Sequence, residues 1–118
     1  MEEQFNLGTV KVSDEVIATI AGVAAIQVEG VAGMSEGIVD GIAKLLTGAQ
    51  QLTKGVKVEI GNGEASLDVS IVIKYGASIQ DIAGKVQENV KKAVENMTGL
   101  KVVKVNLYIQ GIHAEKEK

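Results

Sequence analysis

The side chains that most often carry enzymatic chemistry are few in this chain and are not grouped. His113 is the single histidine, it lies beside a charged C-terminal run, and the chain contains no cysteine. One histidine without cysteine cannot build the usual multi-histidine or thiolate zinc site. The serines have no base other than His113, so a Ser-His-Asp arrangement is not indicated. We therefore expect no catalytic residue, no metal site and no cofactor.

The carboxylates are numerous but have an ordinary explanation. Glu59, Glu64 and Asp68 alternate with apolar residues on expected strands, and Glu88 and Glu95 fall on the polar side of an expected helix. Solvated faces account for this pattern, whereas a general acid and base would need a pocket that the sequence does not indicate. A Gly-x-x-x-x-Gly-Lys-Ser/Thr phosphate loop does not occur in the sequence. The chain is predicted not to be an enzyme.

Two glycines invite a comparison with nucleic-acid binding. Gly30 and Gly33 have the spacing of the Gly-x-x-Gly loop with which KH domains hold a nucleic-acid backbone. Their neighbours Glu29 and Glu36 are acidic, the net charge is −3, and aromatic residues make up 3% of the chain. Nucleic-acid binding usually requires a positive surface. A helix-ending turn is the favoured interpretation, no nucleic acid is expected, and a KH-like RNA-binding module is the alternative.

The region 74–113 predicts a capped helix followed by a returning strand. Ser78 can accept hydrogen bonds from the first helical amides, Asp81 stands three residues on, and Gly99 ends the helix. Apolar residues recur at helical spacing between them: Ile79, Ile82, Ala83, Val86, Val90, Ala93, Val94 and Met97. Residues 103–109 then alternate between apolar and polar, which is typical of a strand with one buried face.

Similar signals divide the preceding residues. Val10 and Val12 indicate a short strand, and Ser13 begins a helix that should run to about Glu29. Residues 56–60 and 67–73 alternate on either side of Gly61-Asn62-Gly63, which is a strong hairpin signal. The triplets Ile20-Ala21-Gly22 and Ile82-Ala83-Gly84 suggest close helix–sheet packing at each glycine.

The expected fold is α+β, a two-layer sandwich in the order β-α-(weak α)-β-β-α-β. A mixed sheet carries its helices on one face, in the manner of split βαβ, ferredoxin-like domains. The length of 118 residues suits one domain, which we place at residues 1–113. Residues 114–118 alternate in charge and are expected to form a disordered, solvated tail.

Two surfaces are candidates for interaction. Residues 38–52 are apolar at helical spacing, rich in glycine and nearly uncharged, so a weak helix there could either join the core or stay partly open for a partner. The second candidate is the polar face of the sheet around Lys104, Asn106 and Tyr108. The candidate contact residues on the first surface are Ile38, Ile42, Leu45, Leu46 and Leu52.

The sequence predicts a cytoplasmic location. The N-terminal residues MEEQFNLG are acidic and lack the pattern of a secretory signal, and no apolar run reaches the length of a membrane span. We expect no direct membrane insertion, so that membrane association would have to come through a partner.

Short pieces spread along the chain carry a family resemblance. These pieces are Glu15-Val16-Ile17, Ile20-Ala21-Gly22, Val28-Glu29-Gly30-Val31, Met34, Lys54-Gly55-Val56-Lys57-Val58, Tyr75-Gly76, Val86-Gln87-Glu88-Asn89-Val90, Met97-Thr98-Gly99, Val105-Asn106 and Gly111-Ile112. In this ordered combination the chain, from about residue 7 to 113, resembles the alkaline shock protein family, also called the Gls-type general stress or envelope stress response family of Gram-positive bacteria. Apart from Met34, residues 33–52 follow no motif of that family.

The resemblance implies a small cytosolic α+β protein without catalytic residues. It implies action through protein partners, including a membrane-anchored one, and a capacity to self-assemble as a homo-oligomer. Some members are linked instead to cytosolic metabolism, which leaves the alternative of a regulatory subunit of a metabolic enzyme in fatty-acid precursor supply. The leading interpretation is a non-enzymatic protein of the cell-envelope stress response.

Overall fold

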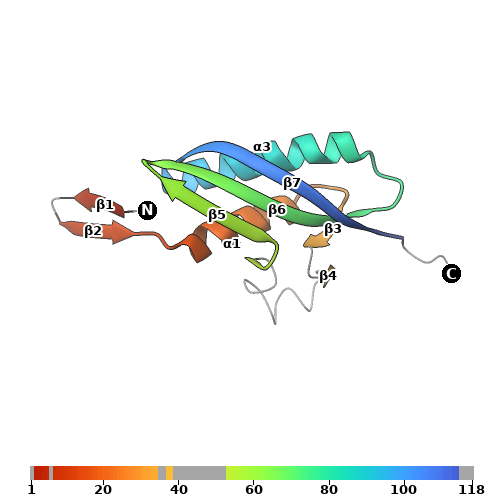
Figure 1. The fold of residues 1–118 in the computed structure, drawn as a ribbon, viewed down its shortest axis with the longest axis horizontal. Coiled ribbons are helices and arrows are strands. Elements are labelled where there is room, and N and C mark those ends of the chain that lie inside the picture. The colour runs from red at the N-terminus through yellow and green to blue at the C-terminus, as the bar shows by residue number, and fades with distance from the viewer. Residues whose placement is uncertain (1, 6, 35–36, 39–52, 115–118) are drawn as a thin grey trace.

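The computed structural model describes residues 2–5, 7–34, 37–38 and 53–114, which form two helices and seven strands (Figure 1). In chain order these are β1 (Glu2–Phe5), β2 (Gly8–Lys11), α1 (Asp14–Ile26), β3 (Val31–Met34), β4 (Gly37–Ile38), β5 (Val56–Gly61), β6 (Glu64–Lys74), α3 (Ile79–Thr98) and β7 (Lys101–His113). β1 and β2 form a separate two-stranded hairpin that extends from one end of the molecule (Figure 1).

The main sheet is organised around β6. This strand pairs with β5 and β3 in antiparallel fashion and with β7 in parallel fashion, while β4 extends the sheet beyond β3. Both helices lie on the same face of the sheet (Figure 1). The predicted α+β fold, with a mixed sheet and helices on one face, is confirmed, and β7 is an edge strand because β6 is its one partner in the described chain.

The ends of α3 follow the predicted capping chemistry. The Ser78 hydroxyl accepts a hydrogen bond from the Asp81 amide at 3.4 Å. Gly99 adopts φ +78°, a left-handed conformation that glycine reaches without steric cost, and donates to the Glu95 carbonyl at 2.9 Å. The predicted apolar stripe is buried at Ile82, Val86, Val90 and Val94. Ile79 and Met97 extend the stripe in sequence but lie exposed at the two ends of the helix.

The core between the layers consists of aliphatic side chains, as the low aromatic content requires. α1 contributes Ile17 and small residues, and it ends at Ile26, three residues before the predicted end. Of the two glycines expected to pack closely, Gly22 is buried, whereas Gly84 is exposed with open space where a Cβ would lie. The largest fully buried side chains are Ile17, Met34, Leu67, Val69, Ile71, Ile73, Val86, Val90 and Val94.

The hairpin between β5 and β6 confirms the turn read from the sequence. Asn62 and Gly63 both have positive φ, +54° and +75°, which matches the twist of a tight two-residue hairpin turn. Gly61 pairs with Glu64 across the turn, and the register continues to Val56 opposite Val69.

The predicted element order is wrong in the first third of the chain. Residues 31–34 form β3, where a helix-ending turn was expected, and Ile38 lies in β4, opposite Gly33, where a helix was expected. The expected strand at Val10 and Val12 is β2, which ends at Lys11 and is the second strand of a hairpin. The other candidate residues of the weak helix, Ile42, Leu45, Leu46 and Leu52, lie outside the described residues, as does most of the expected tail at 115–118. β3 carries no alternating pattern because all four of its residues are buried.

Candidate functional site

The face of the sheet turned away from the helices is polar. Along β6, Leu67 and Val69 point into the core, while Asp68 and Ser70 point to the opposite side and are partly exposed. The parallel register places Asn106 beside Asp68 and Tyr108 beside Ser70. We define the polar sheet face as Lys57 of β5, Asp68 and Ser70 of β6, and Lys104, Asn106 and Tyr108 of β7.

One hydrogen bond ties the two central strands together on this face. The Asn106 side-chain amide donates to a carboxylate oxygen of Asp68 at 2.8 Å, and both groups are partly buried. A hollow of about 580 Å³ lies beside this pair and is lined from β5, β6 and β7, with Lys57 and Tyr108 at its sides. A second hollow of about 360 Å³ lies toward Lys104. The polar sheet face therefore offers a hydrogen-bonded pair of side chains between two exposed lysines.

The exposed side chains of this face can make contacts with another protein. The described residues contain no group of three or more histidine, cysteine or acidic side chains placed to hold a metal ion. Tyr108 is 47% exposed on β7, and tyrosine is enriched among residues that dominate protein interfaces. Lys57 and Lys104 are exposed near it, and lysines at an interface steer partners of opposite charge.

Three of the predicted contact residues are brought together by this arrangement. Lys104, Asn106 and Tyr108 lie on one face, with spacing enforced by their pairing to β6. Their role in binding remains a prediction. Ile38 lies apart from them in β4, at the opposite end of the sheet path. Gly33 pairs with Val72 inside the sheet, so the glycine loop of a KH-like module does not form here.

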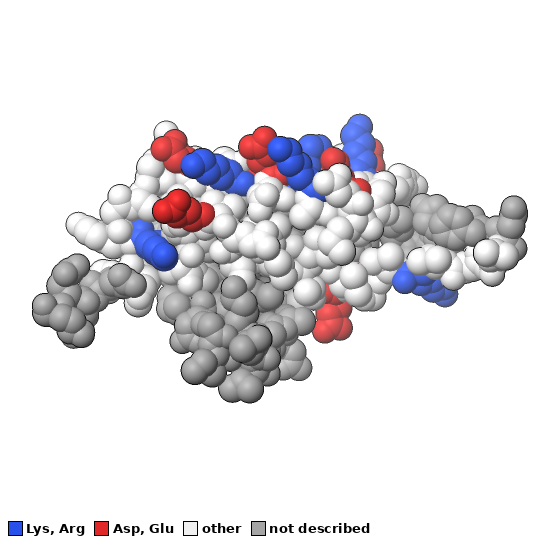
Figure 2. Space-filling view, turned by 180° about the vertical axis from the view of Figure 1, so that it is seen from behind, with Lys and Arg blue, Asp and Glu red and all other residues white. Residues whose placement is uncertain are grey.

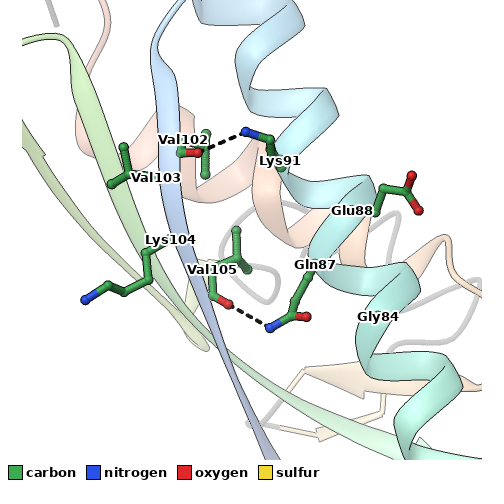
Figure 3. A pocket seen from close by; sticks show the side chains of 8 residues that line it. All are labelled: Gly84, Gln87, Glu88, Lys91, Val102, Val103, Lys104 and Val105. Atoms are coloured by element: carbon green, nitrogen blue, oxygen red, sulfur yellow. Dashed lines mark hydrogen bonds between the residues drawn. The ribbon is translucent and has the colours of Figure 1, made fainter.

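A second feature lies between α3 and the free edge of β7 (Figure 3). Gln87 donates its side-chain amide to the Val105 carbonyl at 3.0 Å, and Lys91 donates to the Val102 carbonyl at 3.2 Å. Glu95 accepts from the Val102 amide at 2.9 Å. Three side chains of α3, each one helical turn from the next, thus bind backbone groups of β7 that a neighbouring strand would otherwise bind. We call Gln87, Lys91 and Glu95 the edge seal.

The electrostatics of the edge seal depend on Glu95. Its carboxylate accepts the Val102 amide hydrogen and is bound by the Lys91 ammonium at 3.1 Å. The backbone hydrogen bond first, and the lysine second, lower the pKa of Glu95 below 4.5. The sequence-based interpretation treated Glu95 as a solvated charge and missed this contact. The 87, 91, 95 spacing of polar side chains on one helix face is the signal that could have found it.

The helix side of the molecule shows no patch of a single charge sign among the described residues. In Figure 2, blue and red side chains gather along the edge formed by α3 and alternate there. Lys91 with Glu95 and Lys92 with Glu88 form ion pairs one helical turn apart. Such exposed pairs contribute little to stability. Their mixed signs do not provide the positive field that nucleic-acid or anionic-membrane binding requires.

Comparisons with known proteins connect this geometry to a family. The model of the alkaline shock protein 23 family, described by a cell envelope-related function, matches residues 2–114. The chain is 39% identical over 110 residues to YqhY of Bacillus subtilis (strain 168), covering 93% of this chain and 81% of the relative. It is 35% identical to YloU of the same organism, covering 95% and 94%.

Two further similarities concern stress and fold. Stress response regulator gls24 homologs of Streptococcus pyogenes are 28% identical over 93% of this chain, and the match spans 62% of their own length. A solved MamM-CTD variant superposes with a TM-score of 0.51 at 14% identity, covering 88% of this chain and all of that domain, which supports the α+β fold alone. Within the described residues, neither helix is both long and apolar enough to cross a membrane.

Proposed function

The chain is a member of the alkaline shock protein 23 family, the Gls-type stress family that its sequence resembles, and from this premise we propose that it is a non-enzymatic interaction protein of the cell envelope stress response. Its binding surface is the polar sheet face. Its partner is a protein at the cell membrane, through which the chain acts on the envelope without entering the bilayer.

The proposal rests on a difference between the side chains of this face: two of them are held in place, and a third is exposed. Asp68 and Asn106 are held by each other and by paired strands, so their positions are set before any partner arrives. Preorganised polar groups lose little entropy on binding. Tyr108 beside them remains 47% exposed and presents a ring for burial. A fixed polar centre beside an exposed tyrosine, with lysines at the rim, can form a contact with another protein.

The description of the family supports a partner at the membrane, because the family is cell envelope-related. Lys57 and Lys104 line the hollows of the face together with Glu59 and Asp68, so a partner segment that carries charges of both signs would complement it.

In-cell crosslinking tests this proposal. A photo-crosslinking amino acid is placed singly at Tyr108, Lys57 or Met97, and adducts are identified separately in membrane and soluble fractions of the native host. Met97 is the matched control because it is 71% exposed on α3, on the other side of the sheet. We expect positions 108 and 57 to capture the same membrane protein and position 97 to capture none.

The outcomes separate the parts of the proposal. Equal capture at all three positions, or capture at Met97 alone, would remove the polar sheet face as the binding surface. Capture of a soluble metabolic enzyme at positions 108 and 57 would keep the surface and replace the membrane partner with the alternative role of a regulatory subunit.

A further inference from the structure

The two hollows of the polar sheet face differ in charge. Lys57 and Asp68 line both of them. The larger hollow adds Lys54 to this pair, and the smaller hollow adds Lys104 and Glu59. The smaller hollow is therefore balanced, with two lysines and two carboxylates, whereas the larger hollow has two lysines against one carboxylate in a chain whose net charge is −3.

The positive charges of the larger hollow are not neutralised by ion pairs within the described chain. The Asp68 carboxylate accepts the side-chain amide of Asn106, which lies toward β7, at 2.8 Å. Lys57 is the β5 neighbour of Asp68 in the strand register, but the ion pairs of the described residues lie on α3 and include neither Lys57 nor Lys54. Both lysines are exposed, so they can meet a negative charge that a partner brings.

The shape of the larger hollow comes from small residues in one row of the sheet. The Ser70 amide donates to the Gly55 carbonyl at 2.8 Å, and Tyr108 is the β7 neighbour of Ser70. Glycine has no side chain and serine has a short one, so this row forms a floor between the Tyr108 ring and the lysines. The Ser70 hydroxyl and the Gln110 side-chain amide line the hollow, and within the described chain neither is used in a side-chain hydrogen bond. Both can donate to an oxygen atom placed there.

This lining fits a carboxylate that belongs to a protein side chain. A carboxylate accepts hydrogen bonds at both oxygens, and charge-assisted bonds from lysine are stronger than those between neutral groups. Pockets for free small molecules are lined mainly by apolar and aromatic side chains, whereas Tyr108 is the one aromatic side chain among the described residues of this hollow. A side chain held in place by the rest of a protein interface does not need such a pocket.

We propose that the larger hollow takes an aspartate or glutamate side chain of the protein partner, bound by Lys54 and Lys57 and by the donors of Ser70 and Gln110. This inference rests on the proposed function and names the residue type that the partner presents. The smaller hollow, with its balanced charges, contributes less to the choice of partner. A protein without an acidic side chain at this point would leave two lysines facing its surface unpaired, which disfavours the wrong partner.

A matched pair of charge reversals on the same face tests the site. Of the two hollows, Lys54 lines only the larger and Lys104 only the smaller, and both lysines are exposed. With the photo-crosslinking amino acid at position 108, partner capture in the native host is compared among the parent, Lys54→Glu and Lys104→Glu. We expect Lys54→Glu to lower the amount of adduct at least about tenfold, because it would face the partner's carboxylate with a like charge, and Lys104→Glu to lower it less than about threefold.

A charge swap then identifies the bound group. The partner segment in the adduct is identified by mass spectrometry, and each acidic residue in or next to that segment is replaced singly by lysine. One such replacement should weaken capture by the parent and restore capture by Lys54→Glu, because opposite charges then meet again. Non-additivity of this kind shows that the two residues interact.

Several outcomes would overturn the inference. These are equal losses for Lys54→Glu and Lys104→Glu, a captured segment that neither contains nor adjoins an acidic residue, and the absence of rescue by every charge swap. Thermal melting verifies that each variant is folded. Any of these outcomes, with position 108 still crosslinked to a membrane protein, would remove the acidic side chain and leave the proposed function standing. Absence of an adduct in the parent would remove the polar sheet face as the binding surface, and this inference with it.

Discussion

Along β6, side chains that face the helices alternate with side chains that face away. Ala65, Leu67, Val69, Ile71 and Ile73 are at most 1% exposed, while the residues between them are partly exposed and, except for Val72, polar. The helix side, which excludes water, holds the fold together. The outer side contributes little to the core, so its residues can be suited to binding without a loss of core packing.

The largest effect is expected from the matched pair Leu67→Ala and Ser66→Ala on adjacent positions of β6. Leu67 is fully buried, so its truncation should lower the free energy of unfolding by about 3 kcal/mol. Ser66 faces outward, and its replacement should change stability by less than about 0.5 kcal/mol. Urea unfolding measures both, and equal losses would contradict the difference between the faces.

Two glycines on the helix side should respond with opposite signs. A Cβ at Gly30 would lie 2.5 Å from Cδ1 of buried Ile82, and φ there is +103°, so Gly30→Ala should cost about 2 kcal/mol. Gly84 is exposed within α3 and has open space, so Gly84→Ala should gain about 0.5–1 kcal/mol from helix propensity. Urea midpoints with unchanged m-values measure both, and a loss at Gly84 would show that the helix is constrained there.

On the outer face, Asn106→Ala should have a smaller effect than Leu67→Ala or Gly30→Ala. The substitution removes the 2.8 Å hydrogen bond to Asp68, which is worth about 1 kcal/mol. Tyr108→Ala is the comparison and should leave stability within about 0.5 kcal/mol while abolishing partner capture. A strongly destabilised Tyr108→Ala variant would place that ring in the fold, and the polar sheet face would lose its anchor.

The smallest effect is a pH dependence at the edge seal. Because the folded pKa of Glu95 lies below 4.5, its carboxylate adds stability above about that pH and loses it as the pH falls through the lower folded value. The stability difference between wild type and Glu95→Gln should therefore be constant near neutral pH and shrink below pH 4.5. Urea unfolding from about pH 7 to about pH 3 measures it, and a difference that grows in acid would contradict the assigned contacts.

Local signals predicted most of residues 53–114. Ser78 and Gly99 bound α3 through hydrogen bonds to neighbouring residues, and Asn62-Gly63 sets the hairpin through its own backbone angles. Both depend on chemistry within a few residues. β3 was not predicted, because its four residues are all buried, include a glycine and show no alternation of apolar and polar side chains. They form a strand because they pair with β6, a segment far along the chain.

For the polar sheet face, too, one part could be predicted from local sequence and another depends on strand pairing. The alternation of residues 103–109 was sufficient to place Lys104, Asn106 and Tyr108 on one face, because side chains of a strand alternate whatever its neighbours are. The partners of that face could not be read in advance: Asp68 meets Asn106 only because β7 pairs in parallel with β6.

The sequence by itself determined the capped helix α3, the β5–β6 hairpin, the aliphatic core and the absence of cysteine and of grouped histidines, because each is a property of composition or of residues close in the chain. Only the tertiary structure decided the strand order, and with it the identity of β7 as an edge strand. The edge seal follows from that decision, since Gln87, Lys91 and Glu95 become hydrogen-bond partners of β7 only when the chain returns beside α3. Which backbone groups remain unpaired depends on contacts between distant segments, and those contacts exist only in the folded chain.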